Sequence, residues 1–320
     1  MTATSHPRAW KVLLAFAIIY LVWGSTFLAI RIGVREVPPF LLAGLRFFVA
    51  GAALYLWMRA QGTPSPARRE WRAASILAVL MFVLDYGLLF WAEQRVASGV
   101  AAVMMATTPA FMALGEVSFL RTQRLTLRLA LAILLGIAGV AALVGYSPFA
   151  QPTSRGEAPI DAAGAVALIV GSISWSVASL LSRKMPLPAA KAMSSGTQML
   201  AGGALLVVTS ALLGEFRGFH PQAVSASAWL ALAYLTVAGS IVAFTAYIWL
   251  LHHESPTKVG TYAYVNPVVA VVIGYFLGGE SISARTIVGT LLVLVSVVVI
   301  TRIPAKETQV SREAEKVAQA

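Results

Sequence analysis

The chain contains no cysteine, and only 12% of its 320 residues are charged. The absence of cysteine excludes disulfide bonds, thiol chemistry and cysteine-ligated metals. The sequence also has no G-x-S-x-G, no H-E-x-x-H and no glycine-rich phosphate-binding loop. Serine hydrolases, zinc proteases and direct use of ATP are therefore disfavoured. These absences leave an enzyme as a weak alternative, and they predict neither a cofactor nor a metal site.

Apolar residues are abundant instead, at 58% of the chain with a mean hydropathy of +0.79. A soluble protein of this length could not bury so much apolar surface, whereas a lipid bilayer accommodates it. Runs of roughly 20 apolar residues are long enough to cross ~30 Å of hydrocarbon at 1.5 Å per residue. Ten such runs are predicted at residues 12–30, 40–58, 73–92, 97–119, 125–145, 161–182, 192–213, 227–250, 259–277 and 285–302. The predicted fold class is an all-α integral membrane protein with ten transmembrane helices.

The net charge of +11 could suggest nucleic-acid binding, but the distribution of the basic residues gives a simpler explanation. With the N-terminus inside, 17 of the 24 lysines and arginines fall on the inner side and six on the outer side, and Arg46 lies within a span. This asymmetry follows the positive-inside rule. We therefore expect no nucleic-acid partner, both termini in the cytoplasm, and a cytoplasmic tail at 304–320.

Two parts of the chain repeat one pattern. Trp23 precedes Gly44, Arg46 and Gly51 by 21, 23 and 28 positions, and Trp175 precedes Gly196, Gln198 and Gly203 by the same intervals. A repeat with an odd number of helices is inverted in the membrane, which is typical of secondary transporters. The predicted domains are a first five-helix repeat at 1–150 and a second, inverted repeat at 151–303, joined by a connector at 146–160.

These features resemble the EamA-type branch of the drug/metabolite transporter superfamily. The resemblance is carried by the segment Trp23-Gly24-Ser25-Thr26, by Pro39 followed by Gly44-Leu45-Arg46-Phe47, by Pro109 and Pro267, and by the turn Gly279-Glu280. It extends from about residue 12 to residue 302. One departure is Gln123, which stands where the first half would carry the Gly-Glu turn.

The resemblance implies two inverted five-helix repeats around a central cavity lined by helices 1–4 and 6–9. It also implies export of amino acids, metabolites or amphipathic drugs across the inner (cytoplasmic) membrane of a bacterial cell. The expected partners are a small-molecule substrate and the lipid bilayer, and the chain could be a monomer or a homodimer.

Three charged residues lie well inside the predicted spans: Arg46, Asp85 and Glu116. A charge in hydrocarbon costs at least ~2.5–3.5 kcal/mol on insertion scales, so each needs a partner or a watery cavity. Arg46 and Asp85 lie at nearly the same depth, which allows an ion pair that either fixes two helices or opens to bind substrate. Asp85 and Glu116 are candidates for proton coupling, although for Glu116 an interfacial position near Arg121 is the favoured interpretation.

The candidate cavity residues combine these charges with aromatic and polar side chains at helical spacing. Trp23 and Trp175 occupy equivalent places near mid-membrane, where indoles suit flat or amphipathic solutes. The full predicted set is Trp23, Ser25, Thr26, Arg46, Asp85, Tyr86, Thr108, Trp175, Ser176, Ser179, Gln198, Tyr247, Tyr262 and Asn266.

Pro109 and Pro267 fall near the middle of the fourth and ninth predicted helices. Each proline removes a backbone donor and frees the carbonyl four residues earlier, at Met105 and Ala263. The two prolines are therefore either static kinks or a pair of hinges for alternating access.

The sequence as a whole predicts a secondary transporter that exports small neutral or amphipathic metabolites. A polyanion would need several cations, and only Arg46 is available within the spans. A facilitative channel or an exchanger without proton coupling is the alternative, although a single chain with an inverted repeat favours alternating access.

Overall fold

A computed structural model of the chain describes residues 9–120, 125–144, 161–182, 184–253, 259 and 261–302. Within them the chain is helical, and it crosses the bundle ten times. Eight of the helices are long and apolar enough to span a membrane, and Leu127–Leu143 and Tyr262–Gly278 are shorter apolar helices. The predicted class of a ten-helix membrane protein is confirmed. The connector at 146–160, Gln123 and the tail at 304–320 lie outside the described residues.

The first five crossings are α1 (Ala9–Gly33); α2 (Pro39–Ala60); α3 (Arg68–Ala78), η1 (Val79–Gly87) and α4 (Leu88–Ala92); α5 (Ser98–Met105), α6 (Thr108–Gly115) and η2 (Glu116–Leu120); and α7 (Leu127–Val144). The next five are α8 (Ala162–Ser182); α9 (Lys191–Leu212); α10 (Ala226–Tyr234), η4 (Leu235–Val242) and α11 (Ala243–His253); α13 (Tyr262–Gly278); and α14 (Ala284–Thr301). A short 3-10 turn, η3 (Pro221–Ala223), precedes α10. We call the end where α1 begins the basal end and the end where α1 finishes the distal end.

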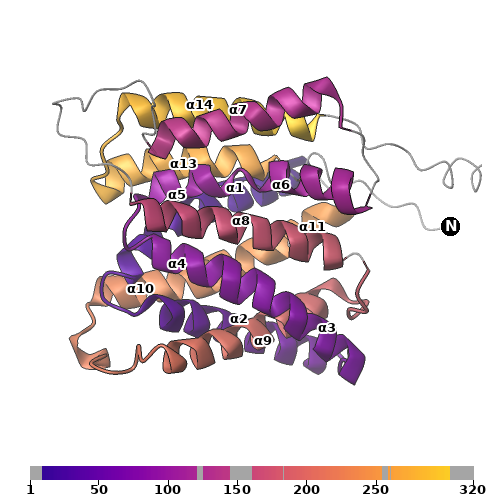
Figure 1. The fold of residues 1–320 in the computed structure, drawn as a ribbon. Helices are drawn as coiled ribbons and strands as arrows, with labels where there is room; N and C mark the ends of the chain where they lie inside the picture. Colours follow the sequence, from indigo (N-terminus) through magenta and orange to yellow (C-terminus); the bar gives the residue numbers. More distant parts are fainter. Residues whose placement is uncertain are drawn as a thin grey trace, which may run out of the picture.

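Helices at equivalent positions of the two halves pack against each other. Figure 1 shows α7 and α14 along one edge of the bundle and α2 and α9 along the opposite edge, with the other helices between them. Large apolar side chains face outward, where lipid would cover them; Leu212 is 83% exposed and Leu277 77%. The bundle is therefore a membrane fold in which α2 meets α9 and α7 meets α14, so that two pairs of equivalent helices form its two edges.

The repeated glycines explain the contact between α2 and α9. A Cβ on Gly51 would lie 2.3 Å from the backbone nitrogen of Leu200, and one on Gly203 would lie 2.2 Å from that of Phe48. Small residues of this kind let two helix backbones touch. The repeated pattern in the sequence thus marks the crossing point of α2 and α9.

Of the three π-helical stretches in the described part of the chain, η1 and η4 interrupt equivalent crossings, and each carries a buried polar side chain. Asp85 lies in η1 and Ser240 in η4, and both side chains are 2% exposed. A π-helical turn changes the direction of the side chains that follow it, and such turns often occur at functional sites. The buried polar side chains of η1 and η4 are therefore candidates for a functional site at the centre of the bundle.

Candidate functional site

A cavity of about 730 Å³ lies at the centre of the bundle. Its volume is within the range of small-molecule binding sites, ~300–1,000 Å³. Of the predicted cavity residues, those that line it are Trp23, Thr26, Arg46, Asp85, Tyr86, Thr108, Trp175, Gln198, Tyr247, Tyr262 and Asn266. Residues from both halves of the chain therefore share one cavity.

The cavity opens at the basal end and is closed at the distal end. Ala189 and Lys191, in and after the connection between α8 and α9, line its mouth and are exposed. Ile30 and Leu89, near the distal ends of α1 and α4, line its deep end and are 1% and 3% exposed. The described lining residues are therefore exposed at the basal end of the cavity and buried at its distal end.

One wall of the cavity is a cluster of three aromatic rings. The centroid of the Trp23 ring lies 5.3 Å from that of Tyr247 and 5.1 Å from that of Tyr262. The indole N–H of Trp23 donates to the carbonyl of Gly239 at 3.0 Å, which ties α1 to η4. Rings at these distances form favourable tilted and edge-to-face contacts, so the three side chains hold one another in place along the wall.

The second indole belongs to an equivalent cluster. Trp175 meets Tyr86 edge to face at 5.9 Å, and Tyr86 in turn contacts Phe47 at 4.6 Å and Phe82 at 6.0 Å. Each tryptophan thus lies against a tyrosine of the other half. The equivalent placement of Trp23 and Trp175 agrees with a lining role rather than an interfacial one.

Arg46 is buried beside this second cluster, with 3% of its side chain exposed. Its Nε donates to the hydroxyl of Ser240 at 2.9 Å, and its guanidinium carbon lies 4.7 Å from the Phe47 ring centre and 5.6 Å from that of Tyr86. Among the described residues, Nη1 has no hydrogen-bond partner. The guanidinium of Arg46 therefore offers the cavity an N–H donor that no described residue uses.

Two further polar atoms in the cavity lining are unpaired among the described residues: Oδ1 of Asp85 and Oδ1 of Asn266. Asp85 packs against Gly171 of α8, where an added Cβ would lie 3.2 Å from the Asp85 Oδ1. Buried polar groups normally have partners, so unpaired ones in a cavity lining are candidates to bind a solute. The cavity thus offers a guanidinium N–H, a carboxyl oxygen and an amide oxygen to a solute.

The ion pair that the sequence allowed between Arg46 and Asp85 is not formed. Within the described part of the chain, neither side chain makes a salt bridge, and Arg46 takes Ser240 as its partner. The similar depth of the two residues was not enough, because η1 directs Asp85 toward α8. Both groups therefore remain available to bind a solute.

Four predicted site residues do not line the cavity. Ser25 lies against Tyr234 with 2.6 Å between the two hydroxyl oxygens, while Ser176 and Ser179 donate to backbone carbonyls of their own helix. Ser176 also donates to the carbonyl of Thr108, so it joins α8 to α6. Glu116 is half-buried at the start of η2, outside the lining. For the three serines the helical spacing indicated helix contacts rather than the cavity.

The two prolines line the cavity but have unequal effects on their helices. The crossing that contains Pro109 is broken between Met105 and Thr108, and the Thr108 hydroxyl donates to the freed carbonyl of Met105 at 2.7 Å. By contrast, Pro267 lies inside an unbroken α13. The helix is already interrupted next to Pro109, so bending at this proline breaks few further helical hydrogen bonds. The pairing of the two prolines as hinges stays a hypothesis.

The distal end is closed by three carboxylates that each bind the other half of the chain. We call Glu36, Glu215 and Glu280 the distal latch. Glu215 accepts from the backbone N–H groups of Phe40 and Leu41 at 3.4 and 3.0 Å, and Glu280 from those of Ser98 and Gly99 at 2.8 and 3.1 Å. Each carboxylate thereby occupies the N-terminus of a helix, where free N–H groups and the helix dipole favour an anion.

Glu36 completes the distal latch at the start of α10. It accepts from the hydroxyl and the backbone N–H of Ser225, both at 2.6 Å. These hydrogen bonds, first the one from the hydroxyl, hold the pKa of Glu36 below its ordinary value. The contact is therefore present above the ordinary pKa of a glutamate and is lost as the pH falls through the lowered one.

A basic residue supports the distal latch from α1. Arg31 lies with its Nε 3.4 Å from a carboxylate oxygen of Glu280, and it donates to the backbone carbonyls of Glu93 and Val96. Glu93 follows α4, is 1% exposed, and has no partner for its carboxylate among the described residues. Burial raises the pKa of Glu93, which favours its neutral form.

Sequence reasoning missed the distal latch, although part of its signal was visible. The turn Gly279-Glu280 carries part of the family resemblance, and Gly214-Glu215 is the same dipeptide at the end of another helix. Both glycines have positive φ, +64° and +74°, so each ends its helix and turns the next glutamate toward a neighbouring helix. The contribution of Phe47 and Phe82 to the aromatic wall was also missed, because apolar residues are frequent in every span.

Comparison with known proteins gives a consistent answer over most of the chain. The EamA-like transporter family matches residues 10–145 and 162–302. The chain is 35% identical over 285 residues to the "Uncharacterized inner membrane transporter YedA" of Escherichia coli K12, covering 88% of each protein. It is 25% identical to "Protein PecM" of Dickeya dadantii over 87% of this chain and 88% of that protein. A crystal structure at 23% identity superposes with a TM-score of 0.58, covering 94% of this chain and all of that one, and so shares its fold.

Proposed function

Because the chain belongs to the EamA-like transporter family and is a membrane transporter, we propose that it is a secondary carrier that exports a small amphipathic solute. The cavity supports this proposal: it is wide enough for a small molecule, and aromatic rings line it on two sides. The absence of nucleotide-binding motifs in the sequence disfavours direct use of ATP.

The unpaired groups in the cavity favour a solute that is neutral overall and carries both signs of charge. Arg46 offers an unused N–H donor to an anionic group, while Asp85 and Asn266 offer acceptors to a cationic or hydrogen-bonding group. A zwitterion with an apolar side chain satisfies all three atoms and places its apolar part against Trp23 or Trp175. A polyanion would leave most of its charge unmatched.

The direction of transport follows from the orientation that we propose from the positive-inside rule. If the basal end faces the cytoplasm, the open mouth at Ala189 and Lys191 loads solute from inside the cell. The proposed domains, 1–150 and 151–303, would then rock against each other, because every carboxylate of the distal latch joins one half to the other. Release of the distal latch would open the cavity outward.

Counterflow in proteoliposomes tests whether the protein is a carrier. Vesicles loaded with one unlabelled neutral amino acid at a time should accumulate the labelled form transiently for the preferred solute. The same preferred solute should raise the melting temperature of the purified protein, because a ligand that binds only the folded state stabilises it. Conductance without saturation or counterflow would support the channel alternative instead and overturn the carrier proposal.

A cross-link across the distal latch is expected to stop transport. The chain lacks native cysteines, so the double variant Glu36→Cys/Ser225→Cys can be joined by a short bis-methanethiosulfonate reagent. The joined protein should lose at least tenfold in counterflow rate and recover when the link is reduced. Each single cysteine variant treated in the same way is the matched control. Full transport by the cross-linked protein would show that the distal latch does not open.

A further inference from the structure

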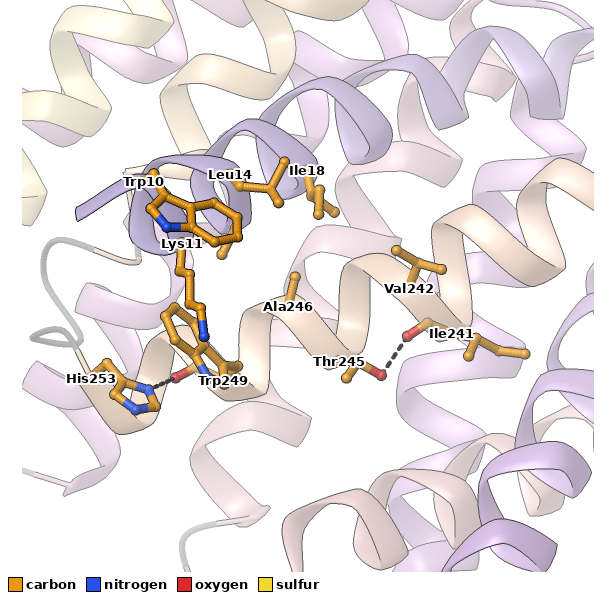
Figure 2. Close-up of a pocket in the computed structure, with 11 residues that line it drawn as sticks. Trp10, Lys11, Leu14, Ile18, Ile241, Val242, Thr245, Ala246, Trp249 and His253 are labelled. Carbon is orange, nitrogen blue, oxygen red and sulfur yellow. Dashed lines mark hydrogen bonds between the residues drawn. The ribbon is translucent and has the colours of Figure 1, made fainter. Parts of the chain in front are cut away.

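A second hollow lies on the outside of the bundle, away from the central cavity. It has a volume of about 670 Å³ and runs between the first part of α1 and the segment Ile241–His253. Figure 2 shows the side chains of α1 along one side and those of α11 along the other. We call it the lateral groove.

The walls of the lateral groove are apolar over most of its length. Leu14 and Ile18 line it from α1, and Val242 and Ala246 from the other side. Leu14 is 51% exposed and Val242 42%, so the groove faces outward from the bundle rather than into it. The hydroxyl of Thr245 donates to the carbonyl of Ile241 at 2.7 Å, which removes it as a free polar group. In a bilayer this surface lies against acyl chains.

One end of the lateral groove is different, because cationic and aromatic residues meet there. Lys11 extends beneath the indole of Trp10, with 5.8 Å between its ammonium and the ring centre (Figure 2). Trp249 faces them from α11 and stacks on His253 with 4.2 Å between ring centres. These residues stand at the start of α1 and the end of α11, which is the basal end of the bundle. None of the described residues that line the lateral groove is acidic.

This arrangement is complementary to a lipid with an anionic headgroup. Indoles are enriched at the depth of the headgroups, and basic pockets between transmembrane helices recognise anionic lipids. The ammonium of Lys11 is exposed and can reach a phosphate, while the Nδ1 of His253 bonds to the carbonyl of Trp249 at 2.8 Å and fixes the ring at the mouth. A lipid whose headgroup meets Lys11 places one acyl chain along Leu14 and Ile18.

We propose that the lateral groove is a binding site for an anionic phospholipid of the leaflet at the basal end, held by Lys11 at its phosphate and by the apolar walls along an acyl chain. The occupant touches both α1 and α11, which belong to the two proposed domains. The site is separate from the central cavity, since the two share none of their lining residues. Its occupation therefore does not depend on which solute is carried.

Tryptophan quenching by brominated lipid measures this binding directly. The full chain is reconstituted in phosphatidylcholine vesicles that contain increasing fractions of dibrominated phosphatidylglycerol, and dibrominated phosphatidylcholine serves as the reference lipid. Phosphatidylglycerol should be preferred several-fold over phosphatidylcholine. The double variant Trp10→Phe/Trp249→Phe should lose the phosphatidylglycerol-specific part of the quenching, because those two indoles line the site.

Charge variants then assign the preference to named residues. Lys11→Gln should reduce the preference about fivefold, the value of one cation near a charged membrane surface, and Lys11→Arg should retain it. Lys184→Gln removes an exposed cation at the same end of the bundle that does not line the lateral groove, and it should change nothing. Equal quenching by the two lipids, or an equal loss in Lys184→Gln, would overturn the proposal.

Discussion

Replacing Arg46 with alanine should reduce transport by about ten- to a hundredfold while leaving the protein folded. A hydrogen bond to a charged group contributes ~1.5–3 kcal/mol, and each 1.4 kcal/mol is a factor of ten. Arg46 holds an unused Nη1 donor in the cavity lining, and the residues described contain no second buried cation there. The solute's anionic group would therefore lose its partner.

Stability should change much less, because two contributions oppose each other. The variant loses the bond from Arg46 to Ser240 but also removes a buried charge whose desolvation is costly. We expect the free energy of unfolding to stay within about 1 kcal/mol of the original value. Thermal unfolding and counterflow, measured on the same preparation, separate the two effects.

The chain itself supplies the matched control. Gln198 occupies the place of Arg46 in the second half and also lines the cavity, but its amide bonds within its own helix to Ser194, at 3.0 Å to the hydroxyl. Gln198→Ala should therefore have a smaller effect, less than tenfold on the counterflow rate. Equal effects of the two variants, or normal transport by Arg46→Ala, would contradict a binding role specific to Arg46.

The second large effect is structural: replacing Gly203 with alanine should prevent close packing of α2 and α9. The new Cβ would lie 2.2 Å from the nitrogen and 2.5 Å from the Cα of Phe48, which are backbone atoms and cannot rotate away. Overpacking commonly costs ~1–3 kcal/mol and more where backbone must move. We expect a loss of about 3 kcal/mol or more, seen as a lower melting temperature and poor yield of folded protein.

A substitution elsewhere at the same pair of helices controls for the added volume. Ala53 lies on α2 and is exposed on its outward face, so Ala53→Val enlarges a side chain without touching α9. Its melting temperature should match that of the original protein. If Gly203→Ala also melts normally, the contact between α2 and α9 is not as close as described.

The cavity residues were predicted well from the sequence where their side chains are charged, and less well where they are small hydroxyls. Eleven of the fourteen predicted cavity residues line one cavity. Charged side chains gave the clearest signal, because they are costly within apolar spans without a cavity or a partner. Small hydroxyls gave a weaker signal: Ser25, Ser176 and Ser179 also satisfy themselves on a helix backbone, and they do so here. Their spacing was compatible with both roles.

The contacts of Arg46 and of the distal latch needed the three-dimensional structure. Depth along a helix follows from residue count, but the direction of Asp85 depends on the π-helical turns of η1, which no local pattern predicted. The partners of Glu36 and Glu215 lie 189 and 175 residues away in the chain. No local sequence pattern indicates which residues so far apart in the chain come into contact.

The sequence by itself determined that this is a ten-helix membrane protein with one pattern written twice, because hydropathy and spacing are local properties of the chain. Only the tertiary structure decided that the repeated glycines are where α2 and α9 touch, that Arg46 bonds to Ser240 rather than Asp85, and that the cavity is open at the basal end. Those outcomes depend on which helices face each other, and packing across the two halves decides that.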